Sequence, residues 1–294
     1  MGERTPDDLQ ARDNAHARDS ARGGLLGLAC GDALGRPVDG HTAAAVRDRH
    51  GRVTEMLGGD DRPAGTTTGV TAAAIRSARG LLRDPRADAT VRPSTGASAE
   101  EAADSASEEA VLLAGAVPYG LTAGADPIDR AAAAVDGLAV ERGDSEEPDA
   151  ATDSLAACAV LAVVVGELVA GASVDDALAT ARRVAVDRDA PVGVRETLAV
   201  VGDPAAATVD AGGGIDATFE TALHEAVAAD GPEEAVVSAV SRGGAASSLG
   251  GVAGAVAGAR AGADAVPARW LNELDGADDL RDLGDRLADA RIEP

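Results

Sequence analysis

Four glycines near the C-terminal end of the chain recur at intervals of four residues: Gly250, Gly254, Gly258 and Gly262. At 3.6 residues per turn, this spacing places all four on one face of a helix. A face without side chains lets a second helix backbone approach very closely, a pattern best known from membrane helices. The segment contains Arg260 and is too short to span a bilayer. It therefore predicts the central packed helix of a globular bundle.

The composition favours the same kind of packing, because large side chains are almost absent. Aromatic residues make up 1% of the 294 residues, whereas apolar residues make up 45%. A core of this size must be built from Ala, Val and Leu, which suits closely spaced helices. No segment shows the two-residue alternation of a strand, apart from a weak pattern over residues 51–56. We expect an all-α fold, a compact multi-helix bundle.

Apolar periodicity, capping residues and Gly or Pro breaks predict where the helices lie. The expected helices cover residues 20–34, 42–50, 69–82, 126–141, 150–169, 173–187, 192–201, 215–229, 232–241, 249–261 and 278–290. Residues 1–19 are expected to form a flexible N-terminal arm, and residues 20–294 a single domain. Residues 83–109 are expected to form an acidic surface loop, since they cannot bury enough apolar surface to offset their ordering cost.

The charge balance restricts the partners of the chain. Asp and Glu number 50 against 26 basic residues, all of them Arg, and the formal net charge is −24. A strongly acidic chain without Lys is typical of halophile-type proteins, which stay soluble at high salt. A field of this sign repels phosphate backbones, and aromatic stacking partners are nearly absent. We therefore expect no binding to nucleic acid.

Targeting signals and cysteine chemistry are also restricted. Cys30 and Cys158 are too few for a disulfide framework or a Cys-based zinc site. The N-terminal residues lack the apolar stretch of a secretory signal. The longest apolar run, residues 155–165, is about half as long as a bilayer span. These features predict a soluble, cytoplasmic protein that does not associate with membranes.

Three blocks carry the strongest motif information. The first reads Gly-Asp-Ala-Leu-Gly over residues 31–35, and the second reads Gly-Thr-Thr-Thr-Gly-Val-Thr over residues 65–71. The third reads Gly-Gly-Ala-Ala-Ser-Ser over residues 243–248, and Val-Pro-Ala-Arg-Trp-Leu follows over residues 266–271. In this order and at these distances, the blocks resemble the ADP-ribosylglycohydrolase family (dinitrogenase-reductase-activating glycohydrolase-like). The resemblance covers about residues 21–290 and implies the all-α fold of that family.

The resemblance implies a dinuclear magnesium centre that holds the ribose hydroxyls of an ADP-ribosylated substrate while the glycosidic link is hydrolysed. In the family, the second block reads Thr-Asp-Asp-Thr and the third reads Gly-Gly-Asp-Thr-Asp-Thr. Carried over by position, the surviving metal positions are Thr68 and Ser248, and the acidic residue after the first block is Asp39. The four family aspartates fall on Gly69, Val70, Ala245 and Ser247.

This set of residues is poor in metal ligands. Mg²⁺ takes carboxylate oxygens first, and two cations a few ångströms apart need several negative groups. Two hydroxyl groups and the carboxylate of Asp39 cannot neutralise the positive charge of two Mg²⁺ ions. We therefore interpret the metal motifs as degenerate: Mg²⁺ binding is predicted to be weak or absent, and no cofactor is expected.

Other positions bear on substrate binding. Gly115 stands where the family carries a substrate-facing Arg, and Gly213 lies in a glycine run that the resemblance places near the ligand pocket. The alternative for that run is a simple interhelical turn. Asp32 is expected to hydrogen-bond backbone beside the site, with a smaller role toward the substrate. The four histidines have no metal-ligand spacing and are expected on the surface: His16, His41, His50 and His224.

Three functional hypotheses follow. The preferred one is a catalytically silent member of the family, a pseudoenzyme that serves as a binding or partner protein, with a weak ADP-ribose-like ligand and an unknown protein partner. The second is a divergent hydrolase of N- or O-glycosidic links, with a site rebuilt around Asp39, Asp32 and Asp60 or Asp61. The third is an interaction protein without a small-molecule ligand. In all three, Thr68 and Ser248 should lie close together at helix N-termini.

Overall fold

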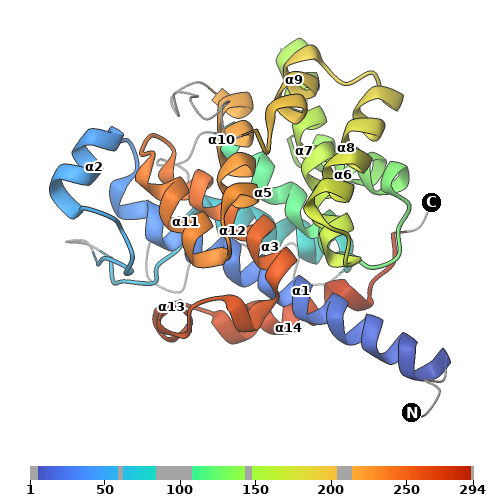
Figure 1. Ribbon diagram of the computed structural model, residues 1–294, viewed down its shortest axis with the longest axis horizontal. Coiled ribbons are helices and arrows are strands. Elements are labelled where there is room, and N and C mark those ends of the chain that lie inside the picture. Colours follow the sequence, from blue (N-terminus) through green and yellow to red (C-terminus); the bar gives the residue numbers. More distant parts are fainter. Residues whose placement is uncertain (1–5, 59–61, 84–107, 143–147, 204–213, 293–294) are drawn as a thin grey trace.

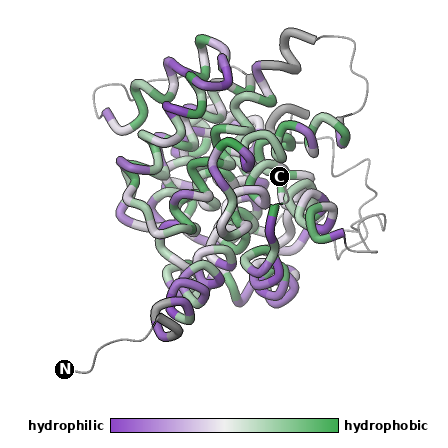
Figure 2. The backbone as a smooth tube through the Cα atoms, turned by 90° about the vertical axis from the view of Figure 1, so that its right-hand side faces the viewer, coloured by the Kyte–Doolittle hydropathy of each residue, from purple (hydrophilic) through white to green (hydrophobic). Residues whose placement is uncertain are grey.

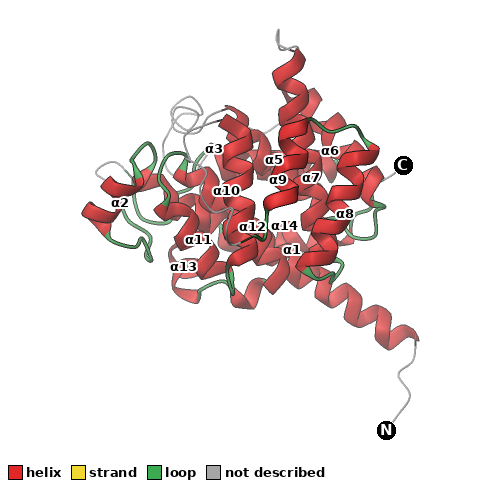
Figure 3. Ribbon diagram, turned by 45° about the horizontal axis from the view of Figure 1, so that its top comes forward, coloured by secondary structure: helices red, strands yellow, loops and turns green. Residues whose placement is uncertain are grey.

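The computed structural model describes residues 6–58, 62–83, 108–142, 148–203 and 214–292. Within these ranges every named element of regular secondary structure is a helix, which confirms the all-α prediction (Figures 1 and 3). The α-helices are α1 Pro6–Gly35, α2 Ala43–His50, α3 Gly69–Leu81, α5 Glu108–Leu121, α6 Pro127–Arg142, α7 Pro148–Val169, α8 Val174–Asp187, α9 Val192–Val200, α10 Gly214–Ala228, α11 Pro232–Ser241, α12 Ala246–Ala261, α13 Ala268–Glu273 and α14 Ala277–Asp289. The 3₁₀ turns are η1 Arg36–Val38 and η2 Ala263–Ala265.

The contact between α1 and α12 forms the centre of the molecule. The glycine stripe of α12 faces a second glycine stripe on α1, and the two helices run antiparallel, so that Gly27 meets Gly254 and Gly31 meets Gly250. A Cβ atom on any of these four glycines would overlap the backbone carbonyl of its partner. The two backbones are therefore in direct contact along several turns.

Helix α12 is the central packed helix that the glycine spacing predicts. Its residues from Ala246 to Ala259 are all buried. Helices α10 and α11 pack against it, and α14 packs against α1. A second group of helices is built around α7, whose segment from Ala157 to Val165 is buried and which packs against α5, α6 and α8. Helix α5 also contacts α12 and so joins the two groups.

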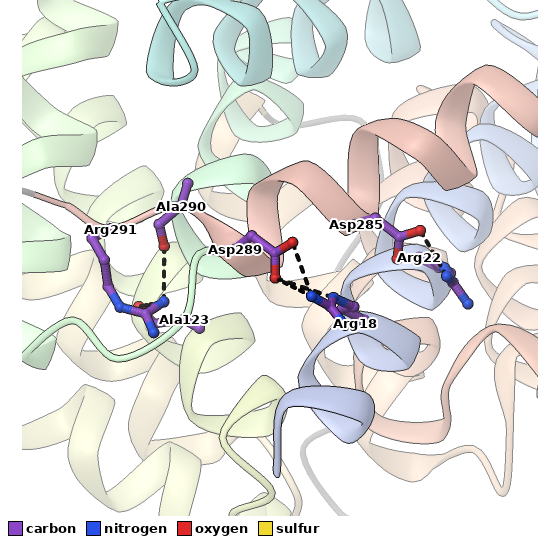
Figure 4. A network of polar contacts seen from close by, with 7 residues as sticks. All are labelled: Arg18, Arg22, Ala123, Asp285, Asp289, Ala290 and Arg291. Carbon is purple, nitrogen blue, oxygen red and sulfur yellow. Dashed lines mark hydrogen bonds and ion pairs between the residues drawn. The ribbon is translucent and has the colours of Figure 1, made fainter. Parts of the chain in front are cut away.

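The first helix begins well before the expected residue 20, because α1 is helical from Pro6. The flexibility of the arm over residues 1–19 stays a prediction. The first turns of α1 project from the body and are hydrophilic (Figure 2). Extending a helix that is already nucleated costs little. The side chain of Arg18 also forms two hydrogen bonds of 3.1 Å with Asp289, and Arg22 bonds Asp285 at 2.6 Å, which ties α1 to α14 (Figure 4).

Three further expectations need correction. Residues 108–109, placed in the acidic loop, belong to α5, a helix that the sequence did not predict because it contains two glycines and Pro118. The rest of that loop lies almost entirely outside the described residues. Residues 51–56 form no strand; instead, the carbonyl oxygen of Thr54 accepts a hydrogen bond of 2.8 Å from Trp270 Nε1. Short helix α13 was also missed.

None of the helices in the described ranges is long and apolar enough to cross a membrane.

The backbone contact between α1 and α12 predicts a large effect of a single methyl group. We expect Gly27→Ala to lower the free energy of unfolding by about 3 kcal/mol, because the added atom can be accommodated only by moving one helix away from the other. The matched control is Gly80→Ala, since Gly80 is an exposed helical residue with no atom within 4 Å of its missing Cβ. That change should raise the free energy by about 0.5–1 kcal/mol. Urea denaturation measures both, and equal midpoints for Gly27→Ala and wild type would contradict the packing.

Candidate functional site

The first part of the site is the N-terminus of α3. Thr68 is the N-cap residue, and its hydroxyl accepts a hydrogen bond of 3.1 Å from the Val70 N–H. The loop before it is held by Arg36, which donates to the carbonyl oxygens of Thr66 at 3.1 Å and Leu57 at 3.3 Å. The end of α1 therefore fixes where α3 begins.

Asp32, on α1, is fully buried beneath this helix start. Its carboxylate accepts hydrogen bonds from the N–H and hydroxyl of Thr68, both at 2.8 Å, and from the N–H and hydroxyl of Thr71, at 3.1 and 2.6 Å. Burial raises the pKa of Asp32, and the hydrogen bonds from Thr71 and Thr68 oppose that rise. As the sequence predicts, Asp32 bonds backbone beside the site, where it caps α3 from a neighbouring helix.

Asp39 makes the matching contact with the N-terminus of α12. Its carboxylate accepts hydrogen bonds from the Ser247 N–H at 2.8 Å and from the Ser247 hydroxyl at 2.5 Å. The backbone next to it is paired too, since the Gly40 N–H donates to Gly244 O and the Gly244 N–H donates to His41 O, both at 2.8 Å. Gly244 adopts a φ of 63°, a conformation that glycine tolerates best.

The environment of Asp39 makes its carboxyl group hard to ionise. The pKa of Asp39 is raised to about 6 as the net result of three effects: burial raises it most, hydrogen bonds from Ser247 lower it, and the nearby charge of Asp32 raises it. The two carboxyl groups thus interact electrostatically across the end of α1. Asp39 is half-buried rather than sealed. It is therefore the solvent-accessible member of the pair.

The starts of α3 and α12 meet beside Asp32. A Cβ on Gly251 of α12 would lie 3.0 Å from Cγ1 of Val70 and 3.9 Å from Cβ of Asp32. Thr68 caps α3, and Ser248 lies in the first turn of α12. Thr68 and Ser248 thus stand near the N-termini of two helices that contact each other, and their predicted closeness to one another stays a prediction.

The positions of the four family aspartates hold no metal ligand apart from one hydroxyl. Val70 is fully buried and fills space against α12, and Gly69 and Ala245 offer no side-chain oxygen. The Ser247 hydroxyl donates to Asp39. The Ser248 hydroxyl is buried with no hydrogen-bond partner in the described part of the chain.

These oxygen atoms do not fit the ligand set of a dinuclear magnesium centre. Each of the two carboxylates near the helix starts already accepts hydrogen bonds from a helix N-terminus, and the Thr68 hydroxyl both donates and accepts. Among the described residues, no group of three or more His, Cys, Asp or Glu side chains is arranged to hold a metal ion. Asp60 and Asp61, which might complete a rebuilt site, lie outside the described residues.

The remaining predicted positions lie elsewhere. Gly115 is on α5 at a tight packing contact, where a Cβ would lie 2.9 Å from Leu138 and 3.1 Å from the Ser77 hydroxyl. Its predicted substrate contact stays a prediction. Gly213 lies outside the described residues. Sequence reasoning missed Thr71 and Arg36; the three-residue spacing from Thr68 to Thr71, typical of a helix start, is the signal that could have identified Thr71.

The model of the ADP-ribosylglycohydrolase family matches residues 13–294. A solved structure described as an "ADP-ribosylglycohydrolase-related protein complex" is 28% identical, covers 93% of this chain and 98% of that chain, and superposes with a TM-score of 0.72. No curated protein sequence matches the chain. The extent of the family match, together with the helical frame around Asp32 and Asp39, shows that the chain belongs to the ADP-ribosylglycohydrolase family.

Proposed function

We propose that this chain is a catalytically silent member of its family, which acts as a binding or partner protein without a dinuclear magnesium centre. The proposal rests on one observation: the carboxylates that remain in the chain at this site are already hydrogen-bonded to protein groups. Asp32 accepts four hydrogen bonds at the start of α3, and Asp39 accepts two from Ser247 at the start of α12. The carboxylates bind protein groups in the region where the family binds metal.

Replacing these hydrogen bonds by metal ligation would be costly. If Asp32 turned toward a cation, the N–H groups of Thr68 and Thr71 would lose their acceptors, and each unsatisfied buried donor costs about 1–3 kcal/mol. The carboxylate positions that could compensate are occupied by Gly69, Val70 and Ala245. The present network therefore favours the metal-free arrangement.

A metal-free cleft also disfavours a nucleotide-like ligand. A pyrophosphate would depend on helix N-termini, which are worth about 0.3–1 kcal/mol each when exposed. Here the N–H groups of Thr68, Thr71 and Ser247 are already hydrogen-bonded to carboxylates. We expect ADP-ribose to bind in the high-micromolar range or not at all. The description of the similar solved structure as a protein complex supports a role with a protein partner.

One observation favours a second candidate, a divergent hydrolase with Asp39 as its acid or base. General acid–base groups work best with a pKa near the operating pH, and the pKa of Asp39 is raised to about 6. Such a site would need a second functional group to activate water or stabilise the ribosyl cation. Asp32 cannot provide it while both of its oxygens cap α3.

Magnesium binding tests the silent assignment. We expect a calorimetric dissociation constant no tighter than about 1 mM at high salt, because hard oxygen ligands are missing at four positions. The variant with Asp at positions 69, 70, 245 and 247 should recover measurable binding, with its fold checked by circular dichroism. A micromolar constant for the wild type would contradict the assignment. A folded quadruple variant that ignores Mg²⁺ would show that these are not the ligand positions.

Turnover separates the two candidates. We expect no release of ADP-ribose from ADP-ribosyl-arginine, ADP-ribosyl-serine or O-acetyl-ADP-ribose, with or without Mg²⁺, because Asp39 lacks a partner for hydrolysis. Chromatography of the products against a no-protein control measures this. Release that rises with protein concentration and disappears in Asp39→Asn would establish the rebuilt-site hydrolase instead.

The raised pKa of Asp39 predicts a pH-dependent stability. The folded state keeps a proton on this group up to about pH 6, whereas the unfolded chain releases it near the ordinary aspartate pKa of 3.8. Its stabilising contribution is therefore complete below the unfolded pKa and is lost as the pH rises through about 6. Between about pH 4.5 and 7.5, we expect the free energy of unfolding of the wild type to fall by about 2 kcal/mol relative to Asp39→Asn.

Denaturation of both proteins at matched salt measures this difference, and the comparison cancels the titration of the other acidic residues. A difference that stays constant across this pH range would mean that Asp39 ionises normally in the folded protein.

A further inference from the structure

A cavity of about 230 Å³ lies between α6, α7, α8 and the turn that leads into α9. It shares no residue with the site at the starts of α3 and α12. Most of its lining is aliphatic and comes from three helices and the turn: Val135, Leu155, Ala156, Ala159, Val160 and Val184, with Ala185, Ala190 and Pro191. A cavity of about 150 Å³ with such a lining can hold benzene, so this one has room for a branched aliphatic ligand.

Two charged residues of opposite sign also line the cavity. Arg188 and Asp189 are adjacent in the sequence and both are exposed. Neither side chain forms an ion pair or a hydrogen bond with another residue in the described ranges. The cavity therefore combines an apolar interior with one available cation and one available anion.

The backbone that carries these two residues has a defined conformation. Asp189 adopts a φ of 49°, in the left-handed region where glycine normally ends a helix. The Ala190 N–H donates to Ala185 O at 2.8 Å, and the Arg188 N–H donates to Val184 O at 3.0 Å, which closes the end of α8. Asp is one of the few non-glycine residues that adopt this conformation readily.

We propose that this cavity binds an apolar α-amino acid of the leucine type. The ligand carboxylate pairs with Arg188, its ammonium group pairs with Asp189, and its side chain enters the aliphatic interior. A fatty acid would place its carboxylate beside Asp189 without a compensating cation of its own. An aliphatic amine would leave Arg188 unpaired and place a like charge next to it. Only a zwitterion with an aliphatic side chain satisfies both charges and the apolar lining.

Titration of the whole chain with three ligands of similar shape tests the proposal. L-leucine carries both charges, 4-methylpentanoate lacks the ammonium group, and 3-methylbutylamine lacks the carboxylate. We expect saturable binding of L-leucine, and binding at least about tenfold weaker for each single-charge analogue. No saturable heat with about 10 mM L-leucine would overturn the proposal. Equal affinity for L-leucine and 4-methylpentanoate would also overturn it.

Variants assign the two charges. Arg188→Gln should weaken L-leucine binding about tenfold and strengthen binding of 3-methylbutylamine, because a like charge is removed. Asp189→Asn should weaken L-leucine binding similarly and strengthen binding of 4-methylpentanoate for the same reason. The matched control is Arg183→Gln, which removes the same charge from an exposed position of α8 outside the cavity. It should bind L-leucine like the wild type. If Arg183→Gln and Arg188→Gln weaken binding equally, the assigned contact is wrong.

A cavity-filling variant tests the location separately from the charges. Ala159→Leu places a larger side chain into the aliphatic interior and should abolish L-leucine binding. Its thermal unfolding midpoint shows whether the protein remains folded. A folded Ala159→Leu variant that binds L-leucine like the wild type would place the ligand elsewhere.

Discussion

The backbone contact between α1 and α12 determines the position of the other site elements. Because glycines face each other along both helices, the two axes approach more closely than side chains would allow. Asp32 directly follows one of these glycines, and Ser247 lies one turn before another. The packing motif and the functional motifs are thus parts of the same two helices. A shift of one helix along the other would separate Asp39 from Ser247.

Around this contact, two carboxylates stabilise two helix starts. A helix N-terminus has free N–H groups and a partial positive charge, so a carboxylate placed there can offset the cost of its own burial. Asp32 and Asp39 use this arrangement at α3 and α12 respectively. In the proposed account, a frame that holds metal ions in the family is kept here by hydrogen bonds instead. Val70, where the family has an aspartate, adds apolar contact to the same junction.

The sequence predicted the helical class, most helix positions and the central role of α12, because the helical periodicity of apolar residues and the spacing of glycines are local signals. It failed where tertiary contacts override local preference. Helix α5 forms despite Pro118 because it is packed between α3 and α7, and α1 begins before residue 20, in a stretch where Arg18 pairs with Asp289. The second glycine stripe was visible in the sequence but was not paired with the first. The role of Thr71 and the pKa of Asp39 depend on burial, which no local pattern reports.

The most direct test of the central claim is an anomalous-scattering map from crystals grown with about 10 mM Mn²⁺, a substitute for Mg²⁺ with the same preference for oxygen ligands. The account predicts no peak between the starts of α3 and α12, with Asp32 still bonded to Thr68 and Asp39 still bonded to Ser247. A peak within about 2.3 Å of the Thr68 hydroxyl and an Asp39 carboxylate oxygen would contradict it. The metal centre would then have survived the loss of four aspartates.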